Sequence, residues 1–379
     1  MSRAATNSQM PSTGLILPGG GARGAYQVGV LKALTDMLPG SPLPFPVISG
    51  ISAGAINAGV LASHAEDFPH AVARLEHFWG GLRCEQVYRT GWRHNLTTGL
   101  HWLAAMTLGG LGVANPRSLL DNRPLAELLE RELDTEKLTA NIDRGRLHTL
   151  VITASGYATN RAVNFFQADP AVEEWTATRQ IGRRAAIDHR HLLASAALPL
   201  VFPAQRLGQE YYGDGGLRQT SPLEPSLRLG VDRLLIIGTR DEMPDPEPVE
   251  AMDYPSLGEI GGYLLDVIFM DHLTNDLARL QRNNRLIDAM PSAEREATGM
   301  RRIDTLLIRP SIDMREIARR HLHRIPASVR ALLRGVGIRS DSRMAGYLLF
   351  EAEFCRELME LGQADALAAR DDILQLLER

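Results

Sequence analysis

The chain has 379 residues, of which 44% are hydrophobic and 23% are charged, and its formal net charge is -4. This composition is ordinary for a folded soluble protein, and the length is sufficient to bury a large core. A slightly acidic chain is not expected to be a general nucleic-acid binder, because such proteins carry a surplus of cations.

The cysteine content also excludes two classes of small-domain architecture. The two cysteines, Cys84 and Cys355, lie far apart, and neither belongs to a C-x-x-C pair. This pattern predicts neither a disulfide framework nor a zinc site. We therefore expect two buried free thiols and no metal.

The first predicted element is a short apolar strand at 14–18, which ends in the glycine-rich run GGGARG at 19–24. Apolar side chains at helical spacing follow it. Backbone N–H groups at such a strand-to-helix turn converge on an anion. A dinucleotide pyrophosphate is one candidate, since the run fits G-x-G-x-x-G, although the acidic residue expected about 20 residues later is missing. The alternatives are the oxyanion of an acyl-transfer reaction and a plain flexible turn.

The second strand, FPVISG, leads through the turn ISAG into a helix rich in small residues, AINAGVLASHA. The run GISAG fits the nucleophile-elbow pattern G-x-S-x-G, with Ser52 between Gly50 and Gly54. Glycines at these positions remove side chains that would clash in a sharp turn, and the helix dipole favours developing negative charge. The alternative is a serine that only caps the helix. Because this strand and the first would open at the same sheet edge, the pair favours the oxyanion interpretation of the glycine loop.

Further buried strands are predicted at 147–155, 232–239 and 304–310. Strands alternating with helices over this length predict an α/β fold with a mostly parallel sheet covered by helices. The acidic, proline-rich stretch 241–255 is predicted to be an exposed linker, and 256–379 a mainly helical C-terminal region packed on the core.

A carboxylate stands between glycines in the run YYGDGG, at Asp214. An isolated Asp-Gly pair usually forms an ordinary turn, which is the alternative here. A serine nucleophile needs a base within about 3 Å, and a carboxylate can serve where burial compensates for its low reference pKa of about 3.9. Together with the two glycine motifs, Asp214 is a candidate base that makes histidine dispensable.

These three motifs, GGGARG, GISAG and DGG, occur in the order found in the patatin-like phospholipases, which the chain resembles from about Thr13 to Thr239. The resemblance extends to AYQVGVL and to HLLASAALPLVFP. It implies a doubly wound α/β fold, an acyl hydrolase core over 13–240, and cleavage of fatty-acyl esters in glycerolipids without a metal or cofactor. It implies Ser52 as nucleophile and Asp214 as general base. The implied oxyanion hole is Gly19, Gly20, Gly21, Ala22, Arg23 and Gly24, and the other motif glycines are Gly50, Gly54, Gly215 and Gly216.

The role of Arg23 within the glycine loop has two interpretations. The simpler one is that its guanidinium braces the loop through a carboxylate or carbonyl, and the alternative is direct contact with a phosphate. The expected reaction starts with proton transfer from Ser52 to Asp214 and proceeds through an acyl-enzyme.

Two segments suggest contact with a membrane surface. The stretch 95–116 carries no formal charge but is too rich in glycine and threonine for a transmembrane helix, so we consider a lid or interfacial loop against a buried core segment. The stretch 317–340 lacks acidic residues and repeats arginine among apolar residues, which fits anionic head groups or a solvated helix face. No signal peptide is apparent, and we expect a cytoplasmic protein with peripheral membrane contact left open.

Three rival functions follow from the same residues. One is a Ser-His-Asp esterase that uses a late histidine, with His272, His321 and His323 as candidates. Another is a nucleotide-binding module built on the glycine loop, and the third is a lipid-binding protein without catalysis. The oligomeric state is not predicted by any of these patterns.

Overall fold

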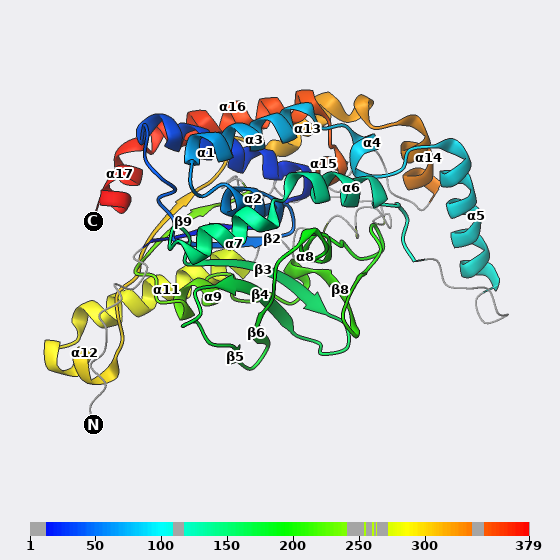
Figure 1. Cartoon of the computed structure of the whole chain (residues 1–379). Helices are drawn as coiled ribbons and strands as arrows, with labels where there is room; N and C mark the ends of the chain where they lie inside the picture. Colours follow the sequence, from blue (N-terminus) through cyan, green and yellow to red (C-terminus); the bar gives the residue numbers. More distant parts are fainter. Residues whose placement is uncertain are drawn as a thin grey trace.

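The computed structural model describes residues 13–108, 117–240, 254, 260, 263, 272–335 and 345–378. Within these ranges the chain forms a ten-stranded mixed sheet with helices on both faces (Figure 1). The strands are β1 (Thr13–Leu17), β2 (Val47–Ile51), β3 (Thr149–Gly156), β4 (Ala162–Ala168), β5 (Trp175–Thr176), β6 (Gln180–Arg184), β7 (Gln205–Leu207), β8 (Glu210–Asp214), β9 (Arg233–Ile237) and β10 (Asp304–Ile308).

The strand order is β10-β9-β1-β2-β3-β4-β6-β5, and every neighbouring pair from β10 to β3 is parallel. In β1, Leu15 and Leu17 belong to one hydrophobic cluster and Ile16 to another, so successive side chains alternate between the two covered faces. The predicted α/β class and mostly parallel sheet are confirmed. The strands β4, β5 and β7 were not predicted from the sequence, and neither was the antiparallel pairing of β8, although YYGDGG indicated a strand end at Asp214.

Helices form a layer on each face of this sheet. The larger layer contains α1, α2, α3 and α16, while α9 and α11 pack against the opposite face. The helices are α1 (Ala25–Met37), α2 (Ala53–Ser63), α3 (Phe68–Gly81), α4 (Cys84–Val87), α5 (Trp92–Leu108), α6 (Arg123–Glu132), α7 (Thr135–Asp143), α8 (His189–Ser195), α9 (Glu224–Arg228), α11 (His272–Ala289), α12 (Ser292–Thr298), α13 (Met314–His321), α14 (Ala327–Gly335), α15 (Ala345–Leu348), α16 (Ala352–Ala368) and α17 (Arg370–Glu378). Short 3-10 turns are η1 (Gly21–Gly24), η2 (Gly215–Leu217) and η4 (Leu322–Arg324).

The C-terminal region contributes to the same layers. Strand β10 extends the sheet beside β9, and α16 packs against α1 with almost no space between the backbones. A Cβ on Gly29 would lie 1.9 Å from Met359 O, and one on Gly362 would lie 2.2 Å from Tyr26 O. The described part of the region is mainly helical and packs on the core. The predicted linker 241–255 lies outside the described residues except for Tyr254.

The two segments considered for membrane contact have different structures. Helix α5 covers 92–108, and the remainder of the first segment, 109–116, lies outside the described residues. In the second, α13, η4 and α14 run to Gly335, and residues 336–340 are not described. Within the described ranges, no helix has the length and apolarity required to cross a bilayer. Cys84 and Cys355 are free and buried, as predicted.

Candidate active site

Ser52 occupies a strained turn between β2 and α2. Its φ of 55° and ψ of -123° lie in a region that residues with side chains rarely adopt, and such strain typically costs about 1–3 kcal/mol. The flanking glycines allow the turn to close. A Cβ on Gly50 would lie 2.5 Å from Gly54 O, and one on Gly54 would lie 1.9 Å from Leu17 O. The sequence GISAG therefore folds into the expected strand-turn-helix, with the serine at the beginning of the helix.

A buried serine holds this turn in place. The N–H of Ser52 donates to Ser195 Oγ (2.8 Å), and the Ser195 hydroxyl donates to Thr153 O (2.6 Å). Ser195 is fully buried at the end of α8. The sequence indicates this region only through the family resemblance, and the role of the Ser195 hydroxyl was not predicted. A small hydroxyl within the apolar run HLLASAALP was the only local signal.

Strand β3 explains how Asp214 reaches Ser52 from a distant part of the sequence. On one edge of β3, β2 pairs up to Ile51 opposite Thr153, while β4 occupies the other edge from Thr149 to Ser155. Strand β8 pairs with the next residues of β3 and places Asp214 opposite Ala154. Strand β8 pairs with β3 on the edge where β2 has ended, so the ends of β2 and β8 meet. Ser52, which follows β2, and Asp214, which ends β8, are thereby brought together.

Asp214 is completely buried, and only part of its carboxylate is hydrogen-bonded. Oδ1 accepts from the N–H of Gly216 (2.9 Å), whereas Oδ2 has no hydrogen-bond partner among the described residues. Burial raises the pKa of Asp214 to about 7, against smaller lowering effects of the Gly216 N–H and the Ser52 side chain. A Cβ on Gly215 would lie 2.2 Å from Thr153 O, so the DGG turn packs tightly on β3.

The glycine loop packs against both the elbow and the C-terminal region. Gly21 has a φ of +56°, and a Cβ there would lie 2.4 Å from Tyr347 O. A Cβ on Gly20 would lie 2.8 Å from the Thr239 hydroxyl, and one on Gly24 would lie 2.8 Å from Ala53 Cβ. These contacts leave no room for side chains. Helix η1 begins at Gly21, and its first hydrogen bond runs from the N–H of Arg23 to Gly20 O (3.2 Å). The N–H groups that precede Arg23 in the loop therefore have no partner within the helix.

A buried polar network ties this loop to α2. The side-chain amide of Asn57 donates to Gly24 O (3.0 Å) and to Gln27 Oε1 (2.9 Å), and it accepts from the Trp79 indole (2.8 Å). Gln27 in turn donates to Pro18 O (2.9 Å). Every side chain in this network is fully buried, so the backbone before and after the glycines is held at both ends.

Arg23 belongs to the glycine loop, and its side chain is buried, with 4% exposed. Its guanidinium carbon lies 4.2 Å from the centre of the Tyr347 ring, and Nη1 lies 3.5 Å from the Tyr347 hydroxyl. Nε and Nη2 have no hydrogen-bond partner within the part of the chain that the structure describes. The contact with an aromatic ring differs from the carboxylate or carbonyl bracing expected from the sequence. The sequence did not indicate it, because Tyr347 lies 324 residues away along the chain.

Gly21, Ser52 and Asp214 line one cavity, whose other walls are apolar. The walls include Trp79, Leu198 and Phe202, together with the C-terminal residues Tyr347, Leu348 and Phe350. The C-terminal wall is fixed by the Tyr88 hydroxyl, which donates to Leu348 O (2.9 Å). The cavity volume is about 40 Å³, which corresponds to about three water molecules. A long acyl chain therefore requires the walls to move apart.

The candidate histidines of a triad lie elsewhere. His272 begins α11, His321 lies 2.8 Å from a carboxylate oxygen of Glu357, and His323 belongs to η4. No described residue that lines the cavity is a histidine. In the described ranges no group of three or more histidine, cysteine or acidic residues is placed to hold a metal.

Comparisons with known proteins place the chain in a family. A family model for patatin-like phospholipase matches residues 15–227. Short matches of 58 residues link the chain to the lysophospholipases nte1 of Aspergillus terreus, at 47% identity, and of Neurospora crassa, at 40%. Each covers 15% of this chain and 4% of the relative, so the chain spans a small fraction of those proteins.

VipD from Legionella pneumophila aligns over 89% of this chain and 67% of its own, with 14% identity and a TM-score of 0.32. The family match does not depend on that alignment. It covers more than half of the 379 residues, including the glycine loop, Ser52 and Asp214. The chain belongs to the patatin-like phospholipase family.

Proposed function

We propose that this protein is a serine acyl-ester hydrolase that releases fatty acids from glycerophospholipids through a Ser52–Asp214 dyad. One observation carries the proposal: a strained, elbow-type serine and a buried carboxylate with a raised pKa line the same apolar cavity. An ordinary aspartate is a weak base, whereas a pKa of about 7 suits proton transfer near neutral pH. The unpartnered Oδ2 is available to accept the serine proton.

In the proposed reaction, Asp214 removes the hydroxyl proton of Ser52 as Oγ attacks the ester carbonyl carbon. The carbonyl oxygen becomes an oxyanion, which the N–H groups of the Gly19–Gly24 loop stabilise. One such donor typically contributes about 3–4 kcal/mol to transition-state stabilisation. The tetrahedral intermediate expels the alcohol, which takes the proton from Asp214, and an acyl-enzyme remains.

Water completes the cycle. Asp214 removes a proton from a water molecule that attacks the acyl-enzyme, and the second tetrahedral intermediate releases the fatty acid as Ser52 recovers its proton. The apolar walls suit the acyl chain, since burial of each methylene contributes about 0.8 kcal/mol. Because the short-match relatives are lysophospholipases, a lysophospholipid is the first natural substrate to test.

The test combines labelling and turnover. We expect a fluorophosphonate to label the wild type at Ser52, and Ser52→Ala to lose both the label and ester hydrolysis while keeping its thermal midpoint. Esterase activity that persists in Ser52→Ala, or a label on another residue, would contradict the assignment. Full loss on replacing His321 or His323, with Asp214 dispensable, would support the triad instead.

A further inference from the structure

Helix α5 presents three large apolar side chains to solvent. Trp92 and Leu96 are each 62% exposed and Leu100 is 57% exposed. Their spacing of four residues places them along one face of the helix, and we call this set the α5 ridge. Single exposed apolar residues are common, but a continuous stripe usually marks an interaction surface.

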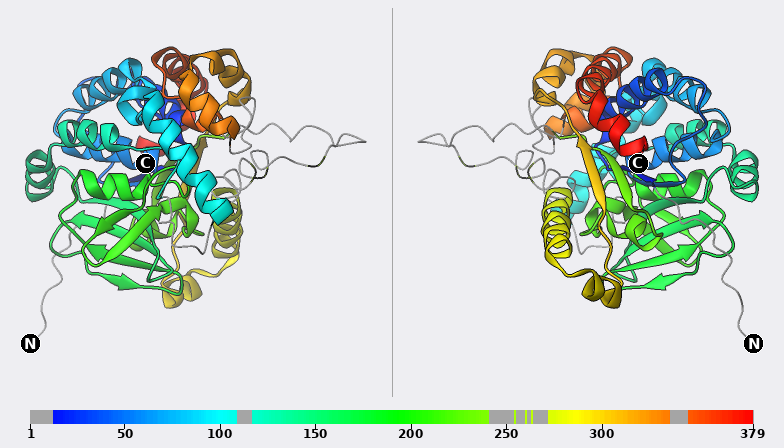
Figure 2. Two further views of the ribbon diagram at one scale, coloured as in Figure 1. Left: turned by 90° about the vertical axis from the view of Figure 1, so that its right-hand side faces the viewer. Right: turned by 90° about the vertical axis from the view of Figure 1, so that its left-hand side faces the viewer.

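The face of α5 next to the ridge is already packed. Asn95 is buried, and Trp102 packs against the core and donates its indole N–H to Ser118 O (3.2 Å). Gly99 faces Leu332 of α14, and a Cβ there would lie 3.4 Å from the leucine side chain. Figure 2 shows α5 crossing one end of the molecule, beside α14. The ridge is thus a second apolar face, additional to the one that attaches the helix.

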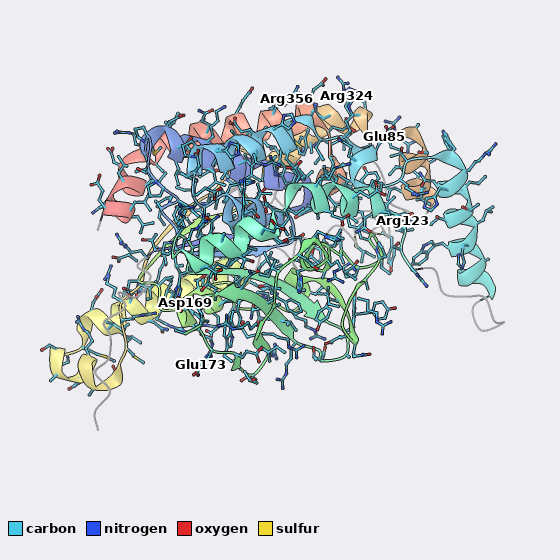
Figure 3. The ribbon with its side chains drawn as sticks, in the orientation of Figure 1. Glu85, Arg123, Asp169, Glu173, Arg324 and Arg356 are labelled. Atoms are coloured by element: carbon cyan, nitrogen blue, oxygen red, sulfur yellow. The ribbon has the colours of Figure 1, made fainter. Side chains whose placement is uncertain are left out.

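The charges around the ridge are mostly positive. From Arg89 to Arg123, both included, the sequence contains four arginines, and Asp121 is the only residue with a carboxylate side chain. Asp121 lies 3.3 Å from Arg89 and 2.5 Å from Arg123. Arg93, next to the ridge, is exposed, and Figure 3 shows Arg123 at the end of α6 that faces α5. Arginines beside an apolar helix face complement the phosphates of anionic lipids.

Residues 117–120, which lie between α5 and α6 in the chain, contact a loop that leads to the cavity holding Ser52. The residues after α5 are hydrogen-bonded to the loop that follows α8, through the N–H of Leu119 and Leu200 O (2.7 Å). Leu200 has a positive φ of 66° and is 66% exposed. The residues two before and two after it, Leu198 and Phe202, line the cavity. A lipid surface that reached the exposed Leu200 as well as the ridge would therefore lie next to this cavity wall.

We propose that the α5 ridge inserts into the interfacial region of a bilayer that contains anionic lipid, with the neighbouring arginines at the headgroup phosphates. The role of the ridge in bringing the cavity to its substrate rests on the proposed function. Vesicle binding itself is measured without catalysis. Trp92 is the most exposed tryptophan of the described chain and reports insertion directly, because its emission would be quenched by brominated acyl chains.

The experiment is flotation of the full chain with phosphatidylcholine vesicles, with and without phosphatidylglycerol. The ridge variant combines Trp92→Ser, Leu96→Ser and Leu100→Ser. The control variant removes three side chains of similar exposure on other elements or loops, namely Leu286→Ser, Met300→Ser and Leu367→Ser. Hydrolysis of a water-soluble short-chain ester and the thermal midpoint are measured in all three proteins.

We expect the wild type and the control variant to float with anionic vesicles and the ridge variant to lose at least about tenfold in partitioning, since each buried apolar side chain contributes a large factor. Brominated lipid should quench the wild type but not Trp92→Phe. Equal flotation of ridge and control variants, or no wild-type binding, overturns the proposal, as does a ridge-dependent dimer without vesicle binding. Ridge-dependent flotation with no ester hydrolysis in any protein would retain the surface and reject the proposed function.

Discussion

The substitution Asp214→Asn separates the stability of the fold from the chemistry of the site. Burial raises the pKa of Asp214 from 3.8 to about 7, and this difference corresponds to about 4 kcal/mol. The unfolded chain loses its proton near pH 3.8, while the folded chain keeps it until about pH 7. Wild-type stability contributed by this group is therefore complete below pH 3.8 and is lost progressively as the pH rises to about 7. Asparagine does not ionise, so the variant avoids the loss.

Urea unfolding measures this effect as the difference between variant and wild type. We expect the difference at low pH to be small, and Asp214→Asn to gain up to about 4 kcal/mol relative to the wild type at about pH 8. Ester hydrolysis should fall by about 10²–10⁴-fold or more in the variant, and wild-type activity should rise with an apparent pKa near 7.

A matched control is available in Asp276, a second buried carboxyl whose pKa is raised by burial and whose Oδ2 accepts from Leu223 N–H (3.0 Å). It lies outside the cavity, so Asp276→Asn should keep full activity. A stability difference for Asp214→Asn that does not change with pH would refute the reasoning, because the carboxyl would then ionise normally in the folded protein.

Three further substitutions test the supports of the site. Ser195→Ala leaves the buried N–H of Ser52 without an acceptor, so it should cost about 1–3 kcal/mol of stability in urea and lower kcat more than it raises KM; an unchanged kcat would argue against positioning. Gly54→Ala places a Cβ 1.9 Å from Leu17 O, and it should abolish fluorophosphonate labelling and lower the thermal midpoint. Phe350→Ala widens the cavity, and the ratio of kcat/KM for long-chain over short-chain esters should rise; a constant ratio would exclude Phe350 as a chain-length determinant.

The sequence predicted the local structure around Ser52 better than the long-range contacts of the candidate site, for a physical reason. Glycine spacing and a strand-helix pattern are local, so GISAG alone predicts a turn of the observed kind around Ser52. The approach of Asp214 depends on β8 pairing with the free edge of β3, and no local pattern specifies which edge is free. The antiparallel pairing of the strands from 162 to 214 was missed because their short apolar runs carry no signal of pairing direction.

The C-terminal wall shows the same limit over a longer distance. Tyr347 contacts the glycine loop and stacks on Arg23, although 324 residues separate the two side chains. The run around Phe350 has the ordinary apolar spacing of a helix start, which predicts burial but not a location. The helical character of the region was predictable, whereas its part in the cavity followed only from the packing of α15 on η1 and of α16 on α1.

In the proposed mechanism, the apolar walls of the cavity account both for binding of the acyl chain and for the basicity of Asp214. The apolar walls that suit an acyl chain also exclude water from Asp214, and this desolvation raises its pKa. Leu348 and Phe350 belong to those walls, although they lie beyond the residues matched by the family model. The C-terminal segment thus helps to set the basicity of a carboxylate on a distant strand. The proposed catalytic unit is therefore larger than the three motifs, because in this mechanism the motifs supply the reacting atoms and the C-terminal segment supplies their low-dielectric surroundings.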